Sequence, residues 1–269
     1  MGAVYLWELR KLRSQKRTYL GLIGVMLVPI AFVVALAAQN GAGPQDIPLG
    51  RALRDTGLAV PFVVLFFMSI WGLPLVTALV AGDIVASESH NGTLKTILTR
   101  SRDRGEVFAG KTCATATYTL LVLFAMVVVG VTAGVIEFGW HPLTSLSGTT
   151  VAPGTGLGLL ALSTLVYAWP LLAIAAFGLM LSTVTRNSAA SVVGTLMFAL
   201  LMQLLGALPG TESIRPYLLG EQFSAWHGLL RRPTDWAPIE RAAWVCAAYA
   251  AVSLGVGYLV FLRRDVTGD

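Results

Sequence analysis

Six long apolar stretches constrain what this chain can fold into more than any other feature of its sequence. Each is long enough to cross a hydrocarbon layer of about 30 Å as a helix, and none contains Asp, Glu, Lys or Arg. In a bilayer every backbone polar group needs an internal partner, so runs of this length must be helical. They also lack the alternating polarity of barrel strands. The stretches are residues 19–38, 58–81, 112–136, 157–183, 188–208 and 242–262.

The sequence therefore predicts an all-α polytopic membrane protein, with residues 1–269 as a single transmembrane domain of six helices. The composition agrees, because only 12% of the residues are charged, against about 25% in soluble domains. The first stretch is too long for a signal peptide, and no convincing cleavage site follows it. We expect a multi-pass protein of the cell inner or plasma membrane.

The distribution of Lys and Arg predicts how the chain is oriented. Of the 19 such residues, 13 fall in the N-terminal tail, in residues 82–111, at Arg186 and at Arg263 and Arg264. All of these segments would share one side of the membrane. Because positive residues accumulate on the cytoplasmic side, both termini are expected to be cytoplasmic. Anionic lipid head groups are sufficient partners for the net charge of +5, so no nucleic acid is expected.

The chain carries no recognisable catalytic or metal-binding set. Cys113 and Cys246 lie near the start of the third and sixth stretches, at opposite faces of the membrane, so we expect no disulfide between them. His90, His141 and His227 are scattered and show no metal-ligand spacing. No paired carboxylates or Ser–His–Asp set can be placed at one depth. We therefore expect neither a metal nor an enzymatic activity of the chain itself.

The N-terminal residues predict an amphipathic helix on the inner leaflet. Its apolar side would contain Tyr5, Leu9 and Leu12, with Trp7 as an interfacial anchor and Glu8 among the polar positions. The alternative is a positive tail that only fixes the topology.

Several features interrupt the apolar stretches. Pro74 is expected to kink the second stretch, and the spacing of Gly130 and Gly134 favours close helix packing. Gln203 is the one strongly polar amide within any stretch; it would face a substrate path or, as we favour, form a hydrogen bond across helices. Residues 209–240 are apolar at near-helical spacing, which predicts a short helix lying on, or dipping into, the outer leaflet.

Residues 83–111 contain the largest group of ionisable side chains. Within them, the run from Gly105 to Gly110, Lys111 and Thr112 matches the phosphate-binding pattern GxxxxGK[ST] literally. That pattern works only between a buried strand and a helix of an α/β domain. Here the preceding residues are a charged turn and the following helix enters the membrane. We therefore expect no ATP or Mg²⁺ site on this chain.

The same connection instead predicts short helices separated by turns. Asn91 and Gly92 would break the helix that extends from the second stretch. Leu94, Ile97 and Leu98 form a small apolar stripe, and Asp103 is spaced to cap the following helix. A short apolar-faced helix in a charged loop is suited to a groove on a partner protein. The alternative is a loop that packs under the bundle.

The run Glu88-x-x-x-Gly92-Thr93-Leu94, followed by Ile97-Leu98, Arg102 and Gly110-Lys111, resembles the signature of type-2 ABC exporter permeases. The predicted topology, the leading amphipathic helix and the apolar segment before the last span are similar to that family as well. Ser101 departs from the pattern, because many members carry proline there.

This resemblance implies a permease that pairs with a separate ATP-binding subunit, which would hold ATP and Mg²⁺, and with a second permease copy, identical or related. The connection would contain the coupling helix that docks on the ATPase, with Glu88 in a polar contact at that joint. The residues implied in coupling are Asp83, Glu88, His90, Gly92, Thr93, Leu94, Ile97 and Leu98.

The implied function is export of an amphipathic or lipophilic cargo, such as a drug, antibiotic, lipid or hydrophobic peptide. The apolar spans agree with such a cargo and argue against a proton relay. The alternative is a non-transport membrane anchor or sensor that docks a cytoplasmic partner through residues 83–111.

Overall fold

A computed structural model describes residues 2–39, 49–90 and 103–263 of the protein. Most of them are helical, and five helices in this part of the chain are long and apolar enough to cross a membrane. This confirms the prediction of a polytopic helical protein. The five helices are α2 (Lys16–Ala38), α7 (Arg104–Phe138), α8 (Pro153–Thr185), α9 (Ser188–Ala207) and α10 (Ala237–Leu262).

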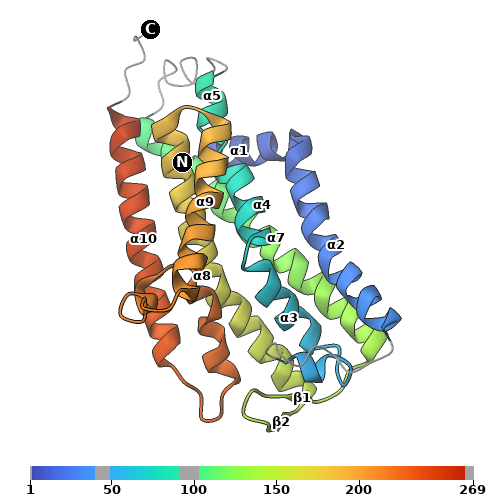
Figure 1. The fold of residues 1–269 in the computed structure, drawn as a ribbon. Coiled ribbons are helices and arrows are strands. Elements are labelled where there is room, and N and C mark those ends of the chain that lie inside the picture. Colours follow the sequence, from blue (N-terminus) through green and yellow to red (C-terminus); the bar gives the residue numbers. More distant parts are fainter. Residues whose placement is uncertain (1, 40–48, 91–102, 264–269) are drawn as a thin grey trace.

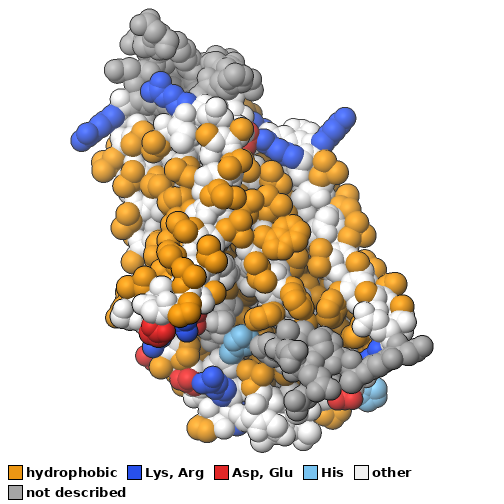
Figure 2. Space-filling view, viewed as in Figure 1, with side chains coloured by type: hydrophobic (Ala, Val, Ile, Leu, Met, Phe, Trp, Pro, Cys, Tyr) orange, Lys and Arg blue, Asp and Glu red, His pale blue; other side chains and the backbone are white. Residues whose placement is uncertain are grey.

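The helices form a bundle whose two ends differ (Figure 1). The short helices α1 (Gly2–Ser14) and α5 (Ala86–His90) lie at one end, together with the last turn of α10. We call this the α1 end. The opposite end holds the 3-10 turn η1 (Gly50–Leu53) and the antiparallel pair β1 (Leu143–Thr144) and β2 (Thr150–Val151). Figure 2 shows a band of apolar side chains between these ends, as expected for a surface that contacts lipid.

The second apolar stretch is a bent pair of helices rather than one straight span. Helix α3 (Ala59–Met68) meets the segment Gly72–Glu88, which begins with α4 (Gly72–Ala81), at an angle of 60°. The helical hydrogen bonding is interrupted at 69–71, which we call the break. Pro74 lies in the first turn of α4, where its missing N–H is tolerated. Its ring excludes a helical carbonyl at Ile70, so the interruption comes before the proline and not at it.

Gln203 of α9 lies against this break. Its Nε2 donates a hydrogen bond of 3.1 Å to the backbone carbonyl of Ser69, an oxygen that a continuous helix would have used itself. The amide therefore bonds across helices and satisfies a group that the break exposes.

Helix α7 is longer than the apolar stretch that predicted it. Asp103 is its N-cap and accepts a hydrogen bond from the backbone N–H of Gly105 at 3.3 Å, so residues 104–111 form its first two turns. Further along, Gly130 and Gly134 face the start of the bent span. A Cβ atom at Gly134 would lie 2.4 Å from the carbonyl oxygen of Gly57, and one at Gly130 would lie 3.3 Å from Cβ of Pro61.

Residues 209–240 pack into the bundle through two 3-10 helices, η2 (Arg215–Tyr217) and η3 (Glu221–Leu230). Trp226 stacks on Phe62 of α3 with ring centroids 5.5 Å apart, and only 1% of Trp226 is exposed. Phe223 meets Tyr167 of α8 at 5.0 Å. The sequence predicted a helix on or in a leaflet; in the structure the apolar side chains of η3 turn inward and contact other helices.

The contact at Gly134 gives a test of the packing. Gly134→Ala places a methyl group against backbone atoms, so the two segments must separate, and we expect a loss of about 1–3 kcal/mol in the free energy of unfolding. Gly158→Ala in α8 is the matched control, because a Cβ there meets nothing within 4 Å. It should be neutral or stabilise the protein by up to about 1 kcal/mol. Thermal unfolding of both variants in detergent measures the difference, and equal midpoints would contradict the packing.

Candidate functional site

A cluster of four charged side chains, three of them buried, lies at the α1 end, and we call it the charge cluster. It consists of Glu8 and Lys11 of α1, Glu88 of α5 and Lys111 of α7. The Lys111 Nζ lies 2.6 Å from Glu8 Oε1 and 2.7 Å from Glu88 Oε2, and it donates to the Ile84 carbonyl at 3.3 Å. Lys11 pairs with the other carboxylate oxygen of Glu88. Three helices that are distant in sequence are therefore joined through one lysine.

The local sequence explains why Lys111 can reach this place. The preceding residue, Gly110, lies directly under α1, and a Cβ there would come within 2.8 Å of Val4 Cγ1 and 3.3 Å of the Tyr5 nitrogen. The missing side chain lets α1 cross α7 closely, which brings Glu8 over the next residue. The Gly-Lys pair of the phosphate-like pattern is thus part of a helix–helix contact.

Residues 105–111 form no loop, because they lie within α7. A phosphate-binding loop holds its ligand with a turn of free backbone N–H groups and a lysine that reaches the phosphates. Here the first turns are helical, and the lysine is fully buried with two carboxylates. The match to that pattern is therefore a match of residue types and not of backbone conformation.

The charge balance of the cluster makes its burial possible. Two lysines face two glutamates, so the set is neutral as a whole, and both Glu8 and Lys111 are completely inaccessible to solvent. Burying two charges costs their hydration free energy, and their mutual attraction offsets that cost only when the geometry and hydrogen bonding are good. Removing one partner leaves an uncompensated buried charge. The cluster therefore holds α1, α5 and α7 in one arrangement rather than in several.

A second ion pair, with a buried carboxylate, fixes the turn between α4 and α5. Arg17, near the start of α2, forms an ion pair with Asp83, and the hydroxyl of Ser188 in α9 donates to the same carboxylate. The hydroxyl oxygen of Ser182 in α8 accepts from the backbone N–H groups of Val85 and Ala86, at 3.1 and 2.9 Å. The start of α5 is thus bound to α2, α8 and α9.

The structure brings together only part of the predicted coupling set. Asp83 and Glu88 are both buried in these ion pairs. His90 is the last residue of α5, and its side chain lies outside the described residues. The predicted residues Gly92, Thr93, Leu94, Ile97 and Leu98 also lie outside them.

The face predicted for α1 needs one correction. Leu12 is buried, Leu9 packs on the core, and the Tyr5 hydroxyl lies 2.9 Å from that of Thr117. Trp7 is half-exposed, with the Lys11 ammonium 5.6 Å from its ring centre. Glu8, which the sequence assigned to the polar side, is fully buried. Its i, i+4 spacing to Leu12 was the signal for this, but its partner on α7 is 103 positions away and could not be inferred.

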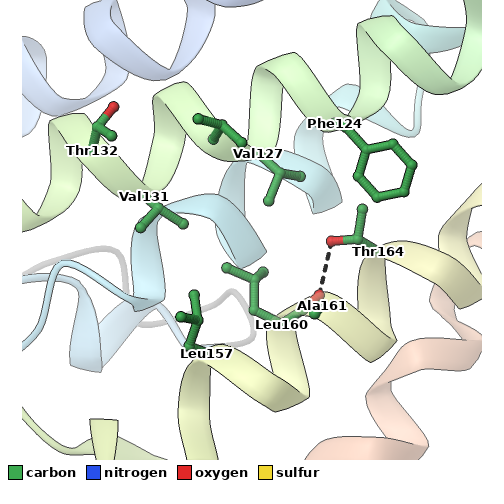
Figure 3. A pocket seen from close by; sticks show the side chains of 9 residues that line it. Phe124, Val127, Val131, Thr132, Leu157, Leu160, Ala161 and Thr164 are labelled. Atoms are coloured by element: carbon green, nitrogen blue, oxygen red, sulfur yellow. Dashed lines mark hydrogen bonds between the residues drawn. The ribbon is translucent and has the colours of Figure 1, made fainter. Parts of the chain in front are cut away.

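An apolar pocket of about 270 Å³ lies between α7 and α8, away from the charge cluster (Figure 3). The Thr164 hydroxyl at its edge already donates to the Leu160 carbonyl at 2.8 Å, and that of Thr132 donates to Val129. The pocket thus offers hydrocarbon contacts. Its lining residues are Phe124, Val127, Val128, Val131, Thr132, Leu157, Leu160, Ala161 and Thr164.

The bundle and its apolar band define a membrane-embedded helical protein with an ion-paired end. The chain belongs to the family described as "Protein of unknown function (DUF2705)", whose model matches residues 49–267. No protein among the curated sequences matches it. The family match begins after α1 and α2 and includes α5, Lys111 and the break.

Lys111 is the residue on which the charge cluster depends. Lys111→Met leaves two buried carboxylates without their common partner, and we expect it to destabilise the protein by about 3–5 kcal/mol. Lys11→Met is the matched control, since this side chain is 25% exposed and forms an ion pair with one carboxylate of the described residues, that of Glu88, and its effect should be smaller.

Adding Glu8→Gln to Lys111→Met removes one of the two carboxylates that lost Lys111 and should recover part of the loss, which a double-mutant cycle quantifies. Thermal unfolding in detergent measures all of these variants. Equal effects of Lys111→Met and Lys11→Met would show that the two carboxylates do not depend on Lys111 more than on Lys11.

Proposed function

We propose that this chain is the membrane subunit of an ATP-driven exporter of the type-2 ABC class, working with a separate ATP-binding subunit. The observation that carries the proposal is the attachment of α5. This short helix follows the bent span at the α1 end, and ion pairs bind it to α1 and α7 while the turn before it is bound to α2. A short helix attached in this way can pass a displacement imposed by a partner protein to the helices that it contacts.

The connections of α5 provide a route for that force. A displacement of α5 acts on α7 through Glu88 and Lys111, and α7 is a continuous helix of 35 residues, about 50 Å long. The same displacement acts on α2 through Asp83 and Arg17. Packed elements with two discrete arrangements are what couples distant sites, and here several spans are tied to one short helix.

In this proposal Glu88 has a different role from the one that the resemblance implied. Its carboxylate points into the chain, toward Lys11 and Lys111, so we assign it to positioning α5. Direct contact with the ATP-binding subunit is assigned to residues 90–98.

The proposed orientation places the α1 end in the cytoplasm, at the inner or plasma membrane. Basic side chains at the start of the chain support this, because positive residues favour that side; they are Arg10, Lys11, Arg13, Lys16 and Arg17. The proposed cargo is amphipathic or lipophilic, and the hydrocarbon-lined pocket between α7 and α8 supports it. A second copy of the chain, or a related one, would complete the translocation path.

Purification of the tagged chain from its native membranes tests the proposal. We expect an ATP-binding subunit to co-purify, and the complex to hydrolyse ATP in lipid nanodiscs. Glu88→Gln weakens the attachment of α5, so hydrolysis should fall by about tenfold, within the range of a coupling energy of 1–3 kcal/mol, while the subunit stays bound.

Glu212→Gln is the matched control, because Glu212 is an exposed carboxylate outside the charge cluster, between α9 and η2. It should hydrolyse ATP as the unmodified complex does. Co-purification of a partner without ATPase activity would contradict transport and favour the membrane anchor, and unchanged hydrolysis in Glu88→Gln would refute the coupling role.

A further inference from the structure

The break between α3 and α4 lies within the apolar band and is exposed on the surface of the bundle. Each of the two helices has 10 residues, about 15 Å, so the break comes near the middle of a layer about 30 Å thick. Ile70 is 42% and Trp71 is 59% exposed. An irregular backbone at this depth is tolerated only where protein buries it or where it lines a water-filled cavity.

The break leaves backbone donors without acceptors. Trp71 is the N-cap of α4 and provides no side-chain cap. Within the described residues, the N–H groups of Trp71 and Gly72 have no hydrogen-bond acceptor. Gly72 is buried, so Trp71 carries the donor at the exposed surface. An amide moved from water into hydrocarbon without a partner costs several kcal/mol, so contact with lipid would penalise this geometry strongly. Gln203 satisfies the Ser69 carbonyl but none of these donors.

A second copy of the chain would not supply the missing acceptors through its helical faces. The outward positions of α2, α9 and α10 are apolar, as Leu27, Leu204 and Val252 illustrate, and the carbonyls of a regular helix are engaged in its own hydrogen bonds. Water, in contrast, can accept a hydrogen bond from an N–H group of the break whatever the orientation of that group.

A further unpartnered polar group packs against Phe66, a residue one helical turn before the break. The ring of His227 in η3 packs beside Phe66, with centroids 6.5 Å apart, and Phe66 precedes Ser69 by three residues. Its Nε2 is buried and has no hydrogen-bond partner among the described residues. Gln203, the break and His227 come from three separate elements, and together they place polar groups along an otherwise apolar part of the bundle.

We infer that the break at 69–71 faces a water-accessible path through the membrane, bordered by Gln203 and His227. Water then satisfies the N–H group of the exposed Trp71, and the bent span does not need lipid contact at this point. The use of this path by a cargo rests on the proposed transport function, whereas its access to water does not.

Cysteine labelling in intact membranes tests this inference. The background is the full-length chain with Cys113→Ser and Cys246→Ala, and the probe is a charged, membrane-impermeant maleimide applied to either side. A thiol reacts as its thiolate, which forms in water and is suppressed in an apolar environment. Ile70→Cys is therefore expected to react at least about tenfold faster than a lipid-facing cysteine, which corresponds to one unit in thiol pKa.

Leu121→Cys is the matched control, because Leu121 is 53% exposed within the continuous helix α7. Trp71→Cys is a second probe of the break in case Ile70→Cys is poorly inserted. If neither position reacts faster than Leu121→Cys, the break faces lipid or protein and the inference is wrong. The assay needs no ATP-binding subunit, so its failure is distinct from failure of the proposed function.

Discussion

The interaction on which the α1 end of this protein depends is the burial of one ammonium group between two carboxylates. Lys111 has no access to solvent and contacts Glu8 of α1 and Glu88 of α5. A lone charge in this position would cost far more than folding can supply, so the three helices must meet together or not at all. Gly110 makes the meeting possible by letting α1 pass close to α7. The arrangement is therefore specified by a charge and by a missing side chain in adjacent positions.

The bent span connects this end to the middle of the bundle. Asp83 and the turn that follows α4 are held by Arg17, Ser182 and Ser188, while the other end of α4 is the break that Gln203 borders. Helix α4 is thus anchored firmly at one end and interrupted at the other. In the proposed transporter, a force on α5 would reach a water-accessible path through this one helix, in addition to the longer route along α7.

Much of the architecture was predictable, because a bilayer leaves a chain few options. Apolar length and the absence of charge located the membrane helices, and the Asp103 cap marked where α7 begins. The bend in the second stretch was predicted from Pro74, although the interruption precedes that residue. The inward packing of η3 was not foreseen, because near-helical apolar spacing does not distinguish a side that contacts lipid from one that contacts other helices.

The sequence by itself determined that this is a helical membrane protein with a charged segment between its second and third apolar stretches, because hydrocarbon forces long uncharged runs into helices. It also excluded a phosphate loop at Gly105–Lys111 from context. Only the tertiary structure decided what Lys111 and Glu8 do, since their contact joins residues 103 positions apart and depends on how α1 crosses α7. Ion pairing between distant helices leaves no periodicity in the sequence. The partners of the charged residues at the α1 end can therefore be identified only from the tertiary structure.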